Sequence, residues 1–162
     1  MPASASRPSA LLDRCSALLS AAGVPHQRID GEVPLLELEW RGRAGTHGAL
    51  IEAWDEARRL KVYAYLPLVV PEAARARACE LLMRANGTLA FGSFDLDLDG
   101  GGVRFRAGTV ADAATLDGAT LELLVEGSLQ IADAWVEGLA AVIAGTCTPA
   151  VACAEVTARL SR

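Results

Sequence analysis

Three aspartates at alternate positions are the residues of this sequence whose spacing most resembles a metal site. The stretch FDLDLDGGGVRFR at residues 94–106 contains Asp95, Asp97 and Asp99 followed by glycine, which is how a calcium loop of the EF-hand kind begins. Such a loop also needs a glutamate at its twelfth position, and counting from Asp95 that position is Arg106. A cation there repels calcium, so the sequence predicts no metal at these residues.

The same stretch has the pattern of a β-hairpin. Apolar and polar residues alternate on both sides of the glycines, with the period of two that is typical of strands. A two-residue turn at 100–101 places Asp97 opposite Arg104 and Asp95 opposite Arg106. Exposed cross-strand pairs of opposite charge contribute roughly 0.2 to 1 kcal/mol each. The aspartates are therefore interpreted as residues that set the register of the hairpin.

Other groups that could do chemistry are few. His26 and His47 are the only histidines, both are expected in exposed loops, and neither has a carboxylate or thiol at a spacing that would orient a base or hold a metal. Glu37 and Glu39 alternate along a strand at about 7 Å, which suits acid–base chemistry, but no neighbour would shift one pKa. The sequence predicts a protein without catalytic activity, metal or cofactor.

Length and composition indicate one packed domain. The chain has 162 residues, of which 52% are apolar and 22% charged, enough to bury a sizeable core. We expect residues 1–8 to be a flexible N-terminus and residues 9–162 to form a single domain.

The charge and the apolar runs restrict the partners. A net charge of −5 disfavours binding to nucleic acid, which requires a basic surface. Asp13 and Arg14 interrupt the apolar stretch near the start, so a signal peptide is not expected. No apolar run approaches the roughly 20 residues that span a bilayer. The sequence therefore predicts a cytoplasmic protein that binds neither nucleic acid nor membrane.

Helical and strand periodicities alternate along the chain in a clear order. A helix, three strands, a second helix, the hairpin and two further helices are predicted at residues 9–22, 33–41, 49–55, 60–68, 71–86, 94–106, 117–144 and 149–160. Ser9 and Asp117 are expected as N-caps, and Gly145 is expected to end the long helix. The predicted fold class is α+β, in the order α-β-β-β-α-β-β-α-α, with an antiparallel sheet and helices packed mainly on one face.

Several of these turn, cap and packing residues form a recognisable pattern over residues 32–155. The pattern consists of Asn86 at a helix end, Gly92-x-Phe94 in a strand, Ala132-Asp133-Ala134-Trp135 in the long helix, and Gly145 to Pro149. It resembles the YbjN family, bacterial proteins described as sensory transduction regulators, whose fold is similar to that of type III secretion chaperones. The resemblance implies a small α/β sandwich that commonly dimerises.

One candidate surface for a partner is an aromatic patch, which we define as Trp54, Tyr63 and Tyr65. Alternation places these side chains on the sheet face opposite the helices, among charged residues at positions 37, 52, 61 and 104. Such amphipathic aromatics are favoured at protein interfaces. Alternatively, a homodimer partner or the terminal helix buries them, or the second strand has the reversed phase and the patch shrinks to the tyrosines.

A second candidate surface is an acidic stripe on the long helix, which we define as Glu122, Glu126, Asp133 and Glu137. Helical spacing places the four on one side, and none has Lys or Arg three or four residues away on that helix. A basic partner would relieve their repulsion; alternatively, the stripe is a solvated acidic face.

The resemblance and the lack of catalytic groups together predict a function. We expect a non-enzymatic protein-binding module of chaperone-like or adaptor type, a homodimer that acts as a regulator through a protein or peptide partner. The alternatives are a structural subunit of a complex, a stress or sensory regulator without client binding, and an enzyme whose site carries no known motif.

Overall fold

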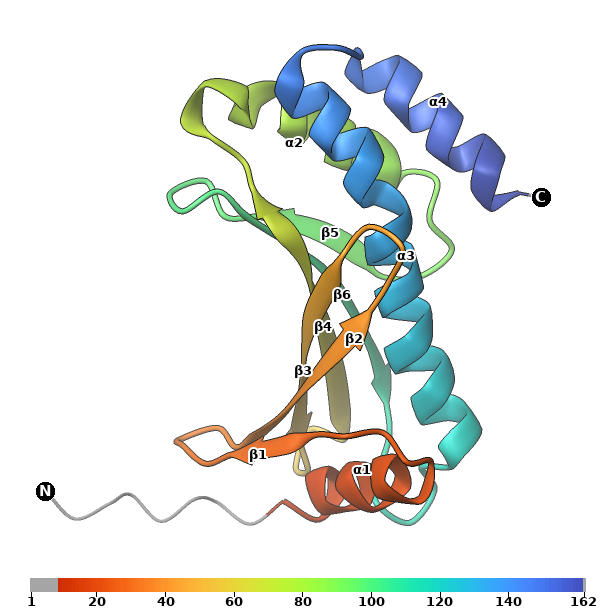
Figure 1. The fold of residues 1–162 in the computed structure, drawn as a ribbon. Helices are drawn as coiled ribbons and strands as arrows, with labels where there is room; N and C mark the ends of the chain where they lie inside the picture. The colour runs from red at the N-terminus through yellow and green to blue at the C-terminus, as the bar shows by residue number, and fades with distance from the viewer. Residues whose placement is uncertain (1–8, 162) are drawn as a thin grey trace, which may run out of the picture.

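A six-stranded antiparallel sheet forms one layer of the computed structural model, which describes residues 9–161 (Figure 1). The strands are β1 (Gln27–Ile29), β2 (Leu35–Arg41), β3 (Thr46–Trp54), β4 (Arg59–Val69), β5 (Ser93–Leu96) and β6 (Gly102–Val110), in the spatial order β1-β2-β3-β4-β6-β5. The predicted flexible N-terminus, residues 1–8, lies outside the described part of the chain.

Four α-helices and one 3-10 turn make up the second layer. They are α1 (Ala10–Ala21), η1 (Glu72–Ala74), α2 (Arg75–Asn86), α3 (Gly118–Ala144) and α4 (Pro149–Leu160). The predicted caps are confirmed, because the Ser9 side chain accepts the N–H of Leu12 and the Asp117 side chain accepts the N–H of Thr120. Gly145 ends α3 in the left-handed conformation, with φ of 75°.

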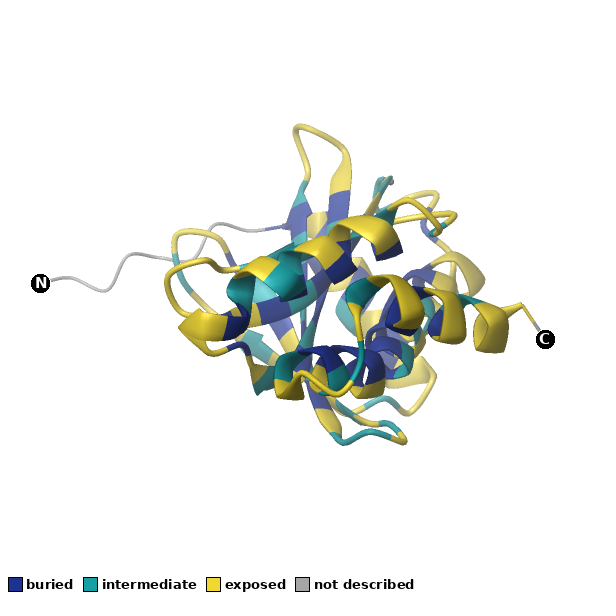
Figure 2. Ribbon diagram, turned by 90° about the horizontal axis from the view of Figure 1, so that it is seen from above, coloured by how far each residue is buried: buried dark blue, intermediate teal, exposed yellow. Residues whose placement is uncertain are grey.

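The helices lie mainly on one face of the sheet. Helix α3 runs along that face and contacts β3, β4 and β6, α1 contacts β2 and β3, and α2 contacts β5 (Figure 1). Helices α2 and α4 pack against each other and against α3. Viewed from above, exposed residues gather on the outer sides of the helices and buried residues face inward (Figure 2). The predicted α+β fold class is confirmed.

Alternation decides which side of each strand faces this core. On β3, Ala49, Ile51 and Ala53 are buried, whereas Leu50 and Trp54 are only half-buried on the other face. The predicted phase of this strand is therefore correct, and the reversed phase is wrong.

Strand β1 was not predicted. Its three residues pair with Leu35, Leu36 and Glu37 of β2 at one edge of the sheet. So short a strand has no periodicity of its own, and its formation depends on the presence of β2.

The hairpin of β5 and β6 has a different register from the predicted one. Asp95 lies opposite Arg104, and the turn spans residues 98–101 rather than two glycines. The Asp97 side chain accepts the Asp99 N–H at 3.0 Å, and Gly101, with φ of 79°, donates its N–H to the Asp97 carbonyl at 2.8 Å. These local bonds favour the longer turn and place Asp97 directly before it, opposite Gly102, so the predicted pair of Asp97 with Arg104 does not form.

Asp95 nevertheless binds both arginines of the hairpin. Its Oδ2 atom lies 3.2 Å from Arg104 Nε and 3.1 Å from Arg106 Nε. Backbone N–H groups of Gly100 and Asp99 hold the pKa of Asp97 below its usual value. No group of three or more His, Cys, Asp or Glu side chains within residues 9–161 is arranged to hold a metal ion.

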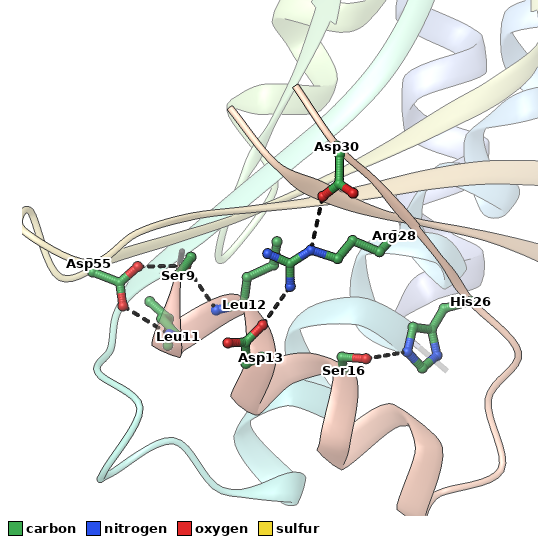
Figure 3. Close-up of polar contacts among 9 residues, drawn as sticks. All are labelled: Ser9, Leu11, Leu12, Asp13, Ser16, His26, Arg28, Asp30 and Asp55. Carbon is green, nitrogen blue, oxygen red and sulfur yellow. Dashed lines mark hydrogen bonds and ion pairs between the residues drawn. The ribbon is translucent and has the colours of Figure 1, made fainter. Parts of the chain in front are cut away.

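The start of α1 is anchored to the sheet by Asp55, just after β3. Asp55 accepts the Ser9 hydroxyl proton and, at 2.9 Å, the Leu11 N–H (Figure 3). His26 lies in a loop as predicted and contacts the Ser16 hydroxyl at 2.7 Å. Both contacts join α1 to the loops beside it.

Candidate protein-binding surface

The sheet face that is turned away from the helices carries a continuous row of large side chains. Cross-strand pairing places Glu37 beside Leu50, Leu50 beside Tyr63, and Tyr63 beside Arg106. We call this side of the sheet the outer face. All three residues of the aromatic patch lie on it, as predicted, because they occupy the outward positions of β3 and β4.

Trp54 and Lys61 form one end of the patch. Lys61 Nζ lies 5.0 Å from the centre of the Trp54 ring, which is a cation–π contact, and Lys61 pairs across the strands with Glu52. Trp54 is half-buried. Its accessible part is therefore an apolar surface beside a cation and an anion.

Tyr63 is less accessible than predicted. Only 7% of its surface is exposed, because the Arg104 guanidinium lies over its ring at 4.6 Å. Burial and the nearby carboxylate of Glu52, to which the hydroxyl is hydrogen-bonded, raise the pKa of Tyr63. Arg104 also hydrogen-bonds to Tyr65. The accessible aromatics are therefore Trp54 and Tyr65, both half-buried.

Leu50 was missing from the predicted patch, although its position on β3 assigns it to the outer face. It is half-buried between Glu37 and Tyr63. Leu50 lies near Tyr65 in the middle of the outer face, and Trp54 lies at one end, beyond the charged Glu52–Lys61 pair, so apolar and charged side chains alternate along this face. Contacts between neighbouring strands already hold these side chains in place, so a partner would meet a preformed surface.

The acidic stripe is not a single exposed face. Asp133 is 8% exposed and hydrogen-bonded inside the protein, and Glu137 pairs with Arg159 of α4 at 2.9 Å. Glu137 is exposed but ion-paired, which leaves Glu122 and Glu126 as the exposed acids of the predicted set without a cationic partner in residues 9–161, and Glu126 accepts a hydrogen bond from Gln130. The expectation of four unpaired carboxylates is wrong, since pairing across helices cannot be found by counting along one helix.

Asp133 instead joins α3 to the β2–β3 turn. Its carboxylate accepts the N–H of Arg43 at 3.0 Å and of Ala44 at 2.8 Å, and it lies 2.9 Å from His47 Nε2. Burial raises the pKa of Asp133, but the hydrogen bonds from Ala44, His47 and Arg43 outweigh it and hold the pKa below its usual value. A side chain at Gly42 would collide with this carboxylate.

The prediction of an exposed loop for His47 is wrong. His47 lies on β3, is fully buried, and contacts the Tyr65 carbonyl oxygen at 3.1 Å through Nδ1 in addition to Asp133. Each ring nitrogen has a partner, and Trp40 packs 5.7 Å away, centre to centre. The buried pair of His47 and Asp133 joins α3 to β3.

Glu122 and Glu126 border an apolar groove that sequence reasoning missed. The groove has a volume of about 380 Å³ and lies between α1, β2 and α3, with Leu18, Leu38, Trp40, Leu121 and Leu129 among its lining residues. Glu39, Glu122 and Glu126 also line it. Three elements from different parts of the chain meet here, so no local pattern could have indicated it.

The described helices include none that is long and apolar enough to cross a membrane.

Comparison with known proteins identifies the sequence family and the fold. The family model YbjN, described as "Putative bacterial sensory transduction regulator", matches residues 11–141. Among solved structures, the crystal structure of the ExsC-ExsE complex matches with a TM-score of 0.55 and 19% identity over 77% of this chain and 90% of that chain. At this identity the likeness shows the fold alone, and it agrees with the predicted chaperone-like architecture. No protein with a curated description matches the chain.

Proposed function

The chain belongs to the YbjN family, and from this premise we propose that it is a non-enzymatic protein-binding module of chaperone-like or adaptor type. It regulates by binding a partner protein or peptide. The observation that carries the proposal is the outer face, where the half-buried Trp54, Leu50 and Tyr65 lie interspersed with charged side chains. The similarity of the fold to a protein solved as a complex adds support.

The composition of the outer face suits reversible binding. Tryptophan, tyrosine and arginine contribute most to the energy of protein interfaces, and all three are present on this face, with Arg104 over the Tyr63 ring and Lys61 over the Trp54 ring. The Arg104 and Lys61 side chains already lie over aromatic rings, so little side-chain entropy remains to be lost when a partner docks. Charges at the rim provide specificity more than affinity.

Two further properties complete the proposal. We include a cytoplasmic location, which the four free thiols support, since such thiols are typical of a reducing compartment. We also include a homodimer, as the family resemblance implies. Light scattering on the purified chain tests the dimer directly.

Capture of partners from the native host lysate tests the function. We compare the tagged wild type with a Trp54→Glu/Tyr65→Glu variant and with a control, Met83→Glu/Leu123→Glu, that changes two exposed apolar residues on the helices. Tyr63 is left intact because it is buried. The same proteins should be recovered with wild type and control and lost with the outer-face variant. For a purified partner, loss of the two accessible aromatics of the patch should weaken binding about 30-fold or more.

The outcomes separate the competing functions. Recovery of the same proteins with all three chains would refute the outer face as the site. In that case a Glu122→Lys/Glu126→Lys variant tests the apolar groove between α1, β2 and α3. One stoichiometric partner that is insensitive to both surface variants would instead indicate a structural subunit. Each variant is first checked for native stability, so that loss of binding is not loss of the fold.

A further inference from the structure

Strand β6 has an open edge beyond the end of β5. Strand β5 pairs only with residues 103–106 of β6, whereas β6 continues to Val110. On the side away from β4, residues 107–110 have no neighbouring strand within the described chain. Unpaired strand edges are the places where an extended segment of another chain can add to a sheet.

Alternation of the ladder identifies which backbone groups face this open side. The Asp97 N–H binds the Gly102 carbonyl, and the Ala111 N–H binds the Arg58 carbonyl of the β4 side, both at 2.9 Å. In an antiparallel ladder, successive residues direct their backbone groups to opposite neighbours. Gly108 and Val110 therefore direct their N–H and C=O groups outward, and both residues are exposed.

The edge is open because the chain turns away from it at Gly92. This residue has φ of 70°, and the chain before it leaves β6 instead of extending β5. By contrast, the outer edge of β5 itself is occupied. The Asn86 side chain accepts the Phe94 N–H at 2.7 Å and donates to the Phe94 carbonyl at 3.2 Å. Asn86 thus takes the place of a neighbouring strand at Phe94 of β5. No side chain within residues 9–161 bonds in this way to the outward backbone groups of residues 107–110.

A basic depression of about 600 Å³ lies beside the open edge. Its lining includes Arg59, Lys61 and Arg106 and contains no acidic residue. All three side chains belong to the outer face, because they occupy the same alternate positions of β4 and β6 as Tyr63. Arg106 is paired with Asp95, and Lys61 lies opposite Glu52. The positive charge of Arg59 is therefore the one least neutralised by a nearby carboxylate. Basic character here contrasts with the net charge of −5 for the whole chain.

We propose that the open edge of β6 binds an acidic, extended segment of a partner protein as an added strand. The backbone of that segment pairs with Gly108 and Val110, and its carboxylates reach Lys61 and Arg59, which lie opposite these two residues on β4. Because Gly108 has no side chain, an acidic side chain of the added strand can extend over the backbone of β6 at this position and reach Lys61 on β4. The open edge supplies affinity through backbone hydrogen bonds, and the cations supply the preference for acidic sequences.

A second copy of this chain fits the edge less well. Antiparallel pairing of two β6 edges would bring two sets of the same three cations together on one continuous face. Like charges on neighbouring strands are destabilising. Charge therefore favours an acidic partner over self-association at this edge.

The inference rests on the proposed protein-binding function but concerns the backbone edge of β6, whose neighbouring cations Arg59 and Lys61 adjoin Trp54 of the aromatic patch. Its test uses a synthetic probe and so does not depend on which proteins are captured from a lysate. Failure of the probe to bind would overturn the edge site alone, whereas failure of the Trp54→Glu/Tyr65→Glu comparison would overturn the outer face alone.

The probe is a short fluorescein-labelled peptide in which glutamate alternates with valine, and binding is followed by fluorescence polarisation. One comparison peptide carries lysine in place of glutamate. The other carries N-methyl groups on alternate residues, which block its backbone pairing without changing its charge. We expect measurable binding of the acidic peptide alone, weakened by added salt. Absence of binding at peptide concentrations up to roughly 1 mM, about −4 kcal/mol, would overturn the proposal.

Two protein variants examine the edge and the charges separately. Val110→Pro removes an outward N–H without removing a bond of the β4 ladder, and it should weaken binding about tenfold, whereas Val110→Thr, which keeps the N–H, should not. Arg59→Glu/Lys61→Glu should weaken binding at least about tenfold. The charge-matched Arg41→Glu/Arg43→Glu, at exposed positions in and after β2, should leave it unchanged.

Three outcomes would contradict the proposal. Equal binding of the N-methylated peptide would show that no strand is added, and equal binding by the Val110→Pro variant would place the peptide elsewhere. Conversion of a dimer into a monomer by Val110→Pro, seen by light scattering, would show that the edge belongs to a second copy of the chain. Thermal unfolding of each variant confirms that the sheet remains folded during these measurements.

Discussion

Replacing Asp133 by alanine is expected to destabilise the fold by about 4 kcal/mol, a large part of the total stability of an ordinary domain. The change leaves the N–H groups of Arg43 and Ala44 and the buried ring of His47 without their common partner. Each buried polar group without a partner costs about 1 to 3 kcal/mol. Urea unfolding followed by circular dichroism measures the loss.

Two further variants show whether the effect comes from the hydrogen bonds. Asp133→Asn keeps one acceptor oxygen and should lose about half as much stability as Asp133→Ala. Glu137→Ala, on the same helix, removes an exposed ion pair with Arg159 and should change stability by less than about 1 kcal/mol. Equal losses for Asp133→Ala and Glu137→Ala would contradict the assigned role of Asp133.

The same carboxylate gives a pH dependence with a defined sign. The pKa of Asp133 in the folded protein lies below its ordinary value of 3.8, so the unfolded chain takes up a proton first as the pH falls. The stabilisation is complete well above that value and is lost as the pH falls through the folded pKa. As the pH is lowered below about 3.8, the free energy of unfolding should therefore decrease less steeply for Asp133→Asn than for the wild type. Parallel curves would contradict this.

Replacing Gly92 by alanine is the second change with a large expected effect, a loss of about 3 kcal/mol. Gly92 has φ of 70°, and a residue with a Cβ adopts that conformation at a cost of about 1 to 2 kcal/mol. The new Cβ would also collide with the Phe105 ring and lie 2.8 Å from the Arg106 carbonyl oxygen. Overpacking of a core costs about 1 to 3 kcal/mol. Urea unfolding again provides the measurement.

A matched glycine in the same hairpin serves as the control. Gly102 begins β6, its φ is not in the left-handed region, and a Cβ there would meet nothing within 4 Å. Gly102→Ala should therefore change stability by no more than about 0.5 kcal/mol. If Gly92→Ala were equally mild, the turn at Gly92 would not be what holds the chain away from the β6 edge, and the account of that open edge would need revision.

Local patterns determined the architecture because strand alternation and helix caps depend only on residues that are close together in the sequence. The alternation in β3 and β4 identified the inward residues, and the caps at Ser9, Asp117 and Gly145 identified helix ends. Turn, cap and packing residues also carried the family resemblance, which the family comparison confirms. For the same reason the sequence placed Trp54 and Tyr65 correctly on the outer face.

Contacts between distant segments were decided by the tertiary structure alone. Asp133 and His47 are separated by 86 positions in the sequence, so the spacing that suggested an exposed stripe and a loop histidine contained no sign of their pairing. The hairpin register depended on an Asp97 side chain bonding to its own turn. Strand β1, the burial of Tyr63 under Arg104, and the open edge of β6 likewise arise where segments meet, because burial and hydrogen-bond pairing belong to the assembled sheet rather than to any one strand.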